Sequence, residues 1–511
     1  MPDEVEFRFT APAGDLSEVL RLDWLKSIAA GAETRERLLS VYFDTEKFRL
    51  WRHGLSLRVR YAGNRRLQTI KATSGTAVAF GRAEWEAELD GQAPDLRLAH
   101  GTALAPLVKK SLPHALIPVF STTVERTTLP IRLGDAELEL ALDRGRIAAN
   151  GHGQPIDEIE IELKSGASAA LADVAERLAR TIPVAWQPRS KAERGYGLAA
   201  GTDDLAVRAA PIVLDPGVST AGAARIIALS CLHHALANAA AVRDEQPQGV
   251  HQMRVGLRRL RAALSVFKDV LRDAGTDSIK TELKWLTEQL GPARDSYVLI
   301  EQRVRPLLGA AAFAGPAAVL ERDLLAEHDA NLCHAIAVID SDRYRALGTR
   351  VALWLANGDW ARTDDPLMRA RRECPARDFA ARCLQRRLRK ILKKAKKIRT
   401  LQPRARHKLR IAVKKLRYAT DFFASLFPGS TRKFRRRLKT VQSLLGTLND
   451  SEVHKRLAAT IVTADRGDGE AASKALAMGL IVGREDMTVG SCLAELEVAV
   501  PRLAKSPAFW R

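Results

Sequence analysis

The hydrophobic periodicity of the chain changes near residue 200, and this change limits the folds it can adopt. Before it, short runs alternate polar and apolar residues, as in 5–9, 55–60 and 159–163. A period of two is typical of strands with one polar face. After it, long Ala-, Leu- and Arg-rich stretches carry apolar residues at helical spacing, as in 223–242 and 378–399. The sequence therefore predicts an α+β chain.

The length of 511 residues exceeds what one ordinary core accommodates, so we expect two domains. The predicted division is a sheet domain at 1–200, a linker rich in Gly, Asp and Pro at 201–217, and an all-helical domain at 218–505.

Targeting and cysteine patterns favour a soluble, cytoplasmic protein. No apolar run reaches the ~18–20 residues of a membrane span, and the N-terminus lacks the basic and apolar regions of a signal peptide. The five cysteines are scattered without CxxC pairs, so we expect neither disulfides nor structural zinc.

The formal net charge of +21 is unevenly distributed. Residues 1–200 hold 27 basic and 27 acidic residues, which leaves 54 basic and 33 acidic residues for 201–511. Such a basic half attracts a polyanion: nucleic acid, an anionic membrane or inorganic polyphosphate. Charge alone does not choose among these.

The polar faces of the predicted strands carry carboxylates in some strands and cations in others. One interpretation is an ordinary solvated sheet surface, and for any single pair of charged residues this interpretation is favoured. The other is a closed barrel in which carboxylates hold Mg²⁺ or Mn²⁺ and cations hold phosphoryl oxygens. The number of such residues favours the second: Glu4, Glu6, Arg8, Arg58, Arg60, Lys71, Glu84, Glu86, Arg126, Asp143, Glu158, Glu160 and Glu162.

An ordered series of motifs in residues 1–200 resembles the CYTH family, the triphosphate tunnel metalloenzymes. The opening motif is Glu4-Val-Glu6-Phe-Arg8, with Arg where the family has Lys, which keeps the charge but changes its shape. The others are Tyr42-Phe43-Asp44, Leu57 to Arg60, Gln68 to Lys71, Arg82-Ala-Glu84-Trp-Glu86, Phe120 to Thr122 with Arg126, Asp143, Glu160-Ile-Glu162 and Ser190 to Tyr196.

This resemblance implies a closed antiparallel tunnel with flanking helices that hydrolyses inorganic triphosphate with a divalent metal. The implied metal ligands are Glu4, Glu6, Glu160, Glu162 and Asp143, and Glu160 and Glu162 are also the implied catalytic pair. The implied triphosphate ligands are Arg8, Arg58, Arg60, Lys71, Arg126 and Lys191. The alternative for each cation is an ion pair with a neighbouring glutamate.

The helical part contains an internal repeat. The segment His251 to Arg261 recurs as His407 to Arg417, and Leu290 to Ser296 recurs as Leu445 to Ser451. The offsets are 156 and 155 residues, which predicts two related helical bundles. In each copy, a histidine begins a stripe of basic residues along one face of the predicted helix. No pair of carboxylates repeats beside the two histidines, so the pattern does not favour a metal site.

These repeated residues resemble the CHAD family, the conserved-histidine α-helical domain, over about 220–505. The resemblance implies a pair of pseudo-symmetric helical bundles that bind inorganic polyphosphate. The implied ligands are His251, Arg254, Arg258, Arg259, Arg261, His407, Arg410, Lys414, Lys415 and Arg417. Basic runs at 386–399 and 432–439 extend the positive surface, and aromatic residues do not interleave with them as in a base-stacking platform.

The leading hypothesis is a metal-dependent inorganic triphosphatase whose helical domain binds long-chain polyphosphate, in the cytoplasm or at polyphosphate granules, without a membrane partner. One alternative is a non-catalytic polyphosphate-binding protein. Glu4, Glu6, Glu160 and Glu162 argue against it, because carboxylates hinder the binding of an anion. A less favoured alternative is a nucleic-acid-binding protein driven by the basic half.

Overall fold

A computed structural model describes residues 3–11, 16–72, 81–108, 112–202, 206–429, 431–464 and 469–510. The chain divides into two compact units. The first contains Met1–Leu257, Asp269–Glu282 and Val338–Arg372; the second contains Arg258–Lys268, Leu283–Ala337 and Glu373–Arg511.

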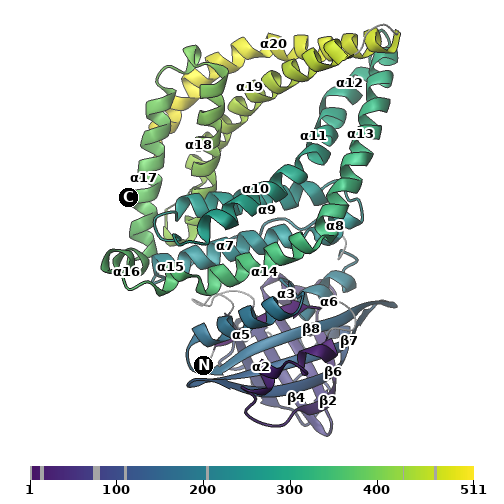
Figure 1. Ribbon diagram of the computed structural model, residues 1–511, viewed down its shortest axis with the longest axis vertical. Coiled ribbons are helices and arrows are strands. Elements are labelled where there is room, and N and C mark those ends of the chain that lie inside the picture. Colours follow the sequence, from purple (N-terminus) through teal and green to yellow (C-terminus); the bar gives the residue numbers. More distant parts are fainter. Residues whose placement is uncertain are drawn as a thin grey trace. The chain divides into compact units, whose positions relative to one another are not determined.

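The N-terminal part of the first unit is an antiparallel sheet in the order β5–β4–β3–β2–β6–β7–β8–β1–β9 (Figure 1). A further pairing joins Asp3–Val5 of β1 to Gly81–Ala83 of β5. The strands are β1 Asp3–Thr10, β2 Thr34–Asp44, β3 Leu55–Ala62, β4 Arg65–Ala72, β5 Gly81–Glu88, β6 Ile117–Leu133, β7 Ala136–Ala149, β8 His152–Ser165 and β9 Ala185–Trp186. The expected antiparallel sheet is confirmed, and its closure into a tunnel stays a prediction.

Helices flank this sheet, as expected. They are α1 Leu16–Val19, α2 Asp23–Lys26, α3 Arg49–Arg52, α4 Leu112–Ala115, α5 Ser168–Thr181 and α6 Lys191–Ala199. The amphipathic α5 packs on β1 and β8 through residues such as Leu171 and Leu178. Tyr196 of α6 packs against Phe120 and Trp51 in the core of the sheet domain, which fixes α6 beside the strands.

The remainder of the described chain is helical, as predicted. The helices are α7 Thr220–Leu236, α8 Ala239–Arg243, α9 Gly249–Val266, α10 Thr276–Gln289, α11 Gly291–Leu299, α12 Arg305–Leu308, α13 Ala314–Asp340, α14 Asp342–Asn357, α15 Asp359–Arg362, α16 Pro366–Glu373, α17 Ala376–Ala395, α18 Pro403–Phe422, α19 Arg432–Ala464 and α20 Gly469–Ala504. The long helices α19 and α20 lie side by side in the second unit (Figure 1).

Two predicted helices have different boundaries. The helix expected over 223–242 is interrupted after Leu236, because the Asn238 side chain donates to the carbonyl oxygens of His234 at 2.7 Å and Val207 at 3.1 Å. A side chain that bonds nearby backbone groups competes with the helical pattern. The helix expected over 378–399 ends at Ala395 and is followed by a short 3₁₀ turn.

One described stretch, Thr220–Arg243, is long and apolar enough to cross a membrane by length and composition alone. Its most apolar window is 56% buried within the protein. Residues such as Ile227 and Leu232 are fully packed, which is also the pattern of a core helix.

Candidate active site and a cationic cluster on the helices

The sheet domain contains a cavity of about 440 Å³ whose walls are mostly charged. Among the predicted site residues, the cavity is lined by Glu6, Arg8, Arg58, Arg60, Lys71, Arg126, Glu160, Glu162 and Lys191. The polar strand faces named from the sequence therefore meet at one cavity instead of facing bulk solvent. The side chain of Glu4, at the start of β1, lies outside the described residues.

Strand register explains why these groups meet. Glu6 of β1 is the cross-strand partner of Glu162 of β8, and Arg8 is the partner of Glu160. Because side chains alternate between the two faces of a strand, these residues share the cavity face. Glu139 of β7 continues the row beside Glu162.

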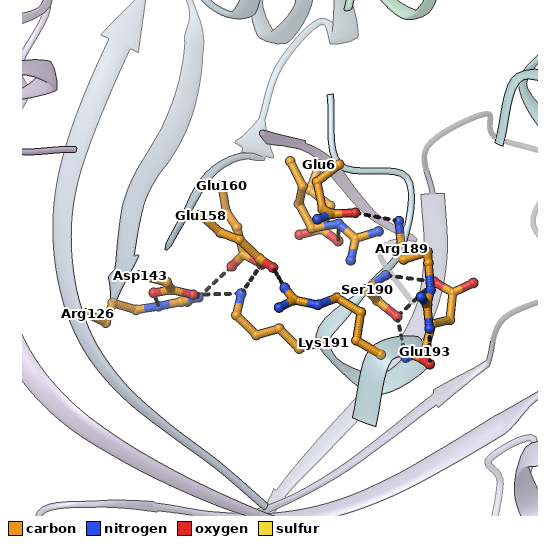
Figure 2. A network of polar contacts seen from close by, with 12 residues as sticks. Glu6, Arg126, Asp143, Glu158, Glu160, Arg189, Ser190, Lys191 and Glu193 are labelled. Atoms are coloured by element: carbon orange, nitrogen blue, oxygen red, sulfur yellow. Dashed lines mark hydrogen bonds and ion pairs between the residues drawn. The ribbon is translucent and has the colours of Figure 1, made fainter. Parts of the chain in front are cut away.

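An ion cluster occupies one wall of the cavity (Figure 2). The Lys191 amine lies 2.8 Å from Asp143, 2.8 Å from Glu158 and 2.7 Å from Glu160. Arg126 donates to both carboxylate oxygens of Asp143 at 2.6 Å, and to Glu160 at 2.5 Å. Asp143 and Glu158 are fully buried.

The electrostatics of this cluster favour the charged forms. Burial alone would raise the pKa of Glu160, but Lys191 and Arg126 together hold that pKa well below its usual range. The same two cations lower the pKa of Asp143 against the effect of burial. Burial would lower the pKa of Lys191, but Asp143, Glu158 and Glu160 raise it above the usual lysine value. Glu160 is therefore a stable acceptor and not a proton donor near neutral pH.

A second group of cations, from β3 and β4, lines the same cavity. Glu84 is shared by Lys71 at 3.0 Å and Arg58 at 3.6 Å. Burial, with the neighbouring guanidinium groups of Arg58 and Arg126, lowers the pKa of Arg60 to about 10. Among the described residues, the buried Nε of Arg60 has no hydrogen-bond partner.

Local structure at the start of α6 positions Lys191. Ser190 caps the helix by accepting from the Glu193 amide at 3.1 Å, and Glu193 accepts from the Ser190 amide at 2.7 Å. This reciprocal capping box makes Lys191 the first residue of the helix. A Cβ at Gly195 would lie 2.1 Å from the Phe120 ring, so the close approach of α6 to β6 requires glycine.

Sequence reasoning missed several groups of the site. Arg194 pairs with Glu158 behind Lys191, and Lys164 lies 2.8 Å from Glu162 and 3.5 Å from Glu139. Arg194 is within the motif Ser190 to Tyr196. Because it follows Lys191 by three residues on a helix, the sequence could have indicated that the two cations share one face. Nothing in the sequence pattern singled out Glu139 or Lys164.

These ion pairs separate the implied metal ligands into two groups. Asp143 and Glu160 are engaged by Arg126 and Lys191, and in the described part of the chain no group of three or more His, Cys, Asp or Glu has metal-binding geometry. Glu6 and Glu162 are cross-strand neighbours at the cavity, and each has one cation beside it: Arg8 lies 3.3 Å from Glu6 and Lys164 lies 2.8 Å from Glu162. This oxygen pair fits a hard divalent cation.

In the helical part, the structure places the two predicted basic stripes on α9 and α18. His407 Nδ1 lies 2.6 Å from Asn449 Oδ1, and Arg410 Nη2 lies 3.7 Å from Asp450 Oδ1. Arg259 is buried against the Phe422 ring, whereas its neighbours on the stripe, Arg254 and Arg258, are half-buried. From 379 to 420, across α17 and α18, the chain has no Asp or Glu.

Comparison with known families identifies both parts. Residues 2–196 match the CYTH domain and residues 226–459 match the CHAD domain. This chain combines a CYTH domain with a CHAD domain. The resemblances expected from the motifs of both parts are confirmed.

Two known proteins extend this result. The chain is 33% identical over 161 residues to an inorganic triphosphatase of Haemophilus influenzae, a match covering 31% of this chain and 44% of that protein. The chain therefore spans less than half the length of this relative. The crystal structure of the CHAD domain from the plant Ricinus communis matches with 27% identity and a TM-score of 0.51, covering 58% of this chain and 96% of that domain.

Proposed function

We propose that the CYTH domain hydrolyses inorganic triphosphate to diphosphate and phosphate with a divalent metal, and that the CHAD domain binds long-chain polyphosphate. The proposal includes a sheet that closes as a tunnel around the cavity. It applies the activity of the Haemophilus relative to the part of this chain that matches the CYTH domain.

The observation that carries the hydrolase proposal is the environment of Arg60. Its guanidinium lies in the cavity wall beside other cations. Burial and the charges of Arg58 and Arg126 lower its pKa to about 10, so its charged form is destabilised there. A preorganised cluster of cations suits a substrate whose charge is spread over several phosphoryl oxygens. Arg8, Arg58, Arg60 and Lys71 are the primary ligands in this proposal. The ion pairs of Arg8 with Glu6 and of Arg58 and Lys71 with Glu84 span 3.0–3.6 Å. They are longer than the 2.5–2.8 Å contacts that hold Arg126 and Lys191 to carboxylates.

The residues that would hold the divalent cation are Glu6 and Glu162, with Glu4 as the adjacent implied ligand. A bound Mg²⁺ or Mn²⁺ would neutralise charge on the phosphoryl oxygens. Glu160 keeps Arg126 and Lys191 in place and, as a permanently ionised acceptor, orients water at the cavity wall. Arg58, Arg60 and Lys71 align the phosphate chain.

The cationic cluster of α9 and α18 supports the polyphosphate proposal for the CHAD domain. Burial and the charges of Arg410 and Arg258 lower the pKa of Lys414 to about 8, which indicates an excess of positive charge at this site. An extended polyanion would offset that excess.

The test is phosphate release from tripolyphosphate with Mg²⁺ or Mn²⁺, together with binding of long-chain polyphosphate. Glu4→Gln/Glu6→Gln should lower release by at least about 100-fold. The matched control is Glu137→Gln, which changes an exposed glutamate of β7 paired with Arg132 and should keep the native rate.

The two activities should separate in a second variant. Arg254→Ala/Arg410→Ala should still release phosphate but bind long polyphosphate at least about tenfold more weakly. A folded native protein that binds polyphosphate yet releases no phosphate would contradict the hydrolase proposal and favour the binding-protein alternative. Duplex DNA binding that survives competition by polyphosphate would favour the nucleic-acid alternative.

A further inference from the structure

The short strand β9, Ala185–Trp186, ends the sheet, and its outer edge lies against the helix α14. On its inner side it pairs with β1, where Trp186 is the partner of Phe9. On its outer side the Trp186 amide donates to Thr349 Oγ1 of α14 at 2.9 Å, and the Thr349 hydroxyl donates to the Val184 carbonyl oxygen at 3.2 Å. Because a hydroxyl both donates and accepts, one threonine takes the place of a further strand at this edge.

This contact is buried within the first compact unit, to which both α14 and β9 belong. Thr349 is 3% exposed and Val184 is 4% exposed, and the hydroxyl also lies 3.3 Å from the Arg345 carbonyl oxygen of its own helix. A second contact joins Arg362 to Asp173 of α5 at 2.5 Å, but these side chains are 49% and 42% exposed. Exposed ion pairs contribute little, whereas a buried backbone group that loses its partner is costly. Loss of the Thr349 hydroxyl should therefore disturb this interface more than loss of the ion pair.

The segment that follows β9 leads directly to the cavity. The Gln187 amide donates to the Arg8 carbonyl oxygen at 2.8 Å, so this segment also fixes the backbone of a residue that lines the cavity. The Gln187 side chain accepts from the Arg189 amide at 3.2 Å, and the next two residues are Ser190 and Lys191. A displacement of β9 would therefore move both Arg8 on β1 and the start of α6.

We propose that Thr349 is a positioning residue of the candidate hydrolase site, through which α14 holds Arg8 and Lys191 in place. Thr349 lies within residues 226–459, which match the CHAD domain, whereas Arg8 and Lys191 lie within residues 2–196, which match the CYTH domain. The helical domain then has a role in hydrolysis besides the proposed binding of polyphosphate. This inference rests on the proposed hydrolysis of triphosphate.

The strand pairing predicts which kinetic constant changes. In the described part of the sheet, β3 and β4, which carry three of the proposed triphosphate ligands, pair with neither β1 nor β9, so substrate binding should be largely retained. Arg8 and Lys191 are the groups held through β9, and a misplacement of about 1 Å at a reacting site costs about 100-fold in rate. Loss of the Thr349 hydroxyl should therefore lower kcat at least about tenfold and raise the KM for tripolyphosphate less than about threefold.

The experiment measures phosphate release from tripolyphosphate with Mg²⁺ by the full chain, together with amide hydrogen exchange over residues 184–191. Thr349→Val keeps the shape of the side chain and removes the hydroxyl. It should show the loss of kcat, exchange over 184–191 that is at least about tenfold faster, and native helical content by circular dichroism. Thr349→Ser retains a hydroxyl and should bring kcat and exchange to within about threefold of the native values.

The matched control is Thr420→Val in α18. Thr420 is also buried, but its hydroxyl donates to the Leu416 carbonyl oxygen of its own helix at 2.9 Å. This variant should keep the native kcat and the native exchange over 184–191. If Thr349→Val does not fold, Thr349→Cys supplies a weaker donor and acceptor, and its kcat should lie at least about threefold below that of Thr349→Ser.

A native kcat in folded Thr349→Val would overturn the inference, whether or not exchange over 184–191 becomes faster. An equal loss of kcat in Thr420→Val would also overturn it, because the effect would then be general destabilisation. In the second series, equal kcat values for Thr349→Cys and Thr349→Ser would do the same. Absence of phosphate release by the folded native protein would instead overturn the proposed hydrolysis, and this inference with it.

Discussion

At the scale of single residues, Lys191 has the largest structural role in the cavity wall. Its amine is shared by three carboxylates, two of them fully buried. Lys191→Met should lower the free energy of unfolding by about 3 kcal/mol, because it removes a buried cation shared by three carboxylates that Arg126 and Arg194 then compensate only in part. Chemical denaturation measures this. Lys164→Met removes a lysine whose side chain is 43% exposed and should cost at most about 1 kcal/mol. Equal losses in the two variants would contradict this assignment.

The same cluster predicts acid sensitivity. The folded-state pKa values of Asp143 and Glu160 are lowered by Lys191 and Arg126 although burial opposes this, so the unfolded chain takes up protons first as pH falls. Their stabilisation is complete above the unfolded carboxyl pKa values of about 3.9–4.3 and is lost below them. Denaturation between about pH 3 and 6 should therefore show a steeper loss for native protein than for Glu160→Gln. Identical slopes would show that Glu160 contributes nothing.

At the scale of elements, the capping box of α6 connects helix stability to the site. Ser190→Ala removes the acceptor for the Glu193 amide and should lower stability by about 1 kcal/mol. Because Lys191 is the next residue, phosphate release should fall as well. Thermal melting and phosphate release measure the two effects. Ser190→Thr keeps a capping hydroxyl and should retain both properties; a Thr variant as impaired as the Ala variant would argue against capping as the cause.

At the scale of the whole molecule, the uneven charge distribution predicts two different salt dependences. The excess of 54 basic over 33 acidic residues lies in 201–511, whereas 1–200 is balanced. Raising salt from 50 to 500 mM should weaken long-polyphosphate binding more than about tenfold, because counterions compete along the chain. The KM for tripolyphosphate should change less than about threefold, since partly buried charges are screened less. Similar salt dependences would show that one surface serves both ligands.

The sequence alone determined the features that depend on local periodicity and order. Alternation placed Glu6 with Arg8, and Arg58 with Arg60, on single strand faces, and the structure confirms that these faces line one cavity. The repeat offset of 156 makes Arg258 and Lys414 equivalent positions of the two copies. The helix break at Asn238 was missed, because it depends on a partner at Val207 that periodicity does not reveal.

Tertiary structure decided which charges become partners. Asp143 was expected to bind a metal, yet strand register and the position of α6 place it between Arg126 and Lys191. The contact of Lys191 with Glu158 joins residues 33 positions apart in the sequence, so it does not follow from local spacing. The physical reason is that periodicity is a short-range property of the backbone. Ion pairing and pKa shifts depend on burial and on separations of a few ångströms, which only the packed chain defines.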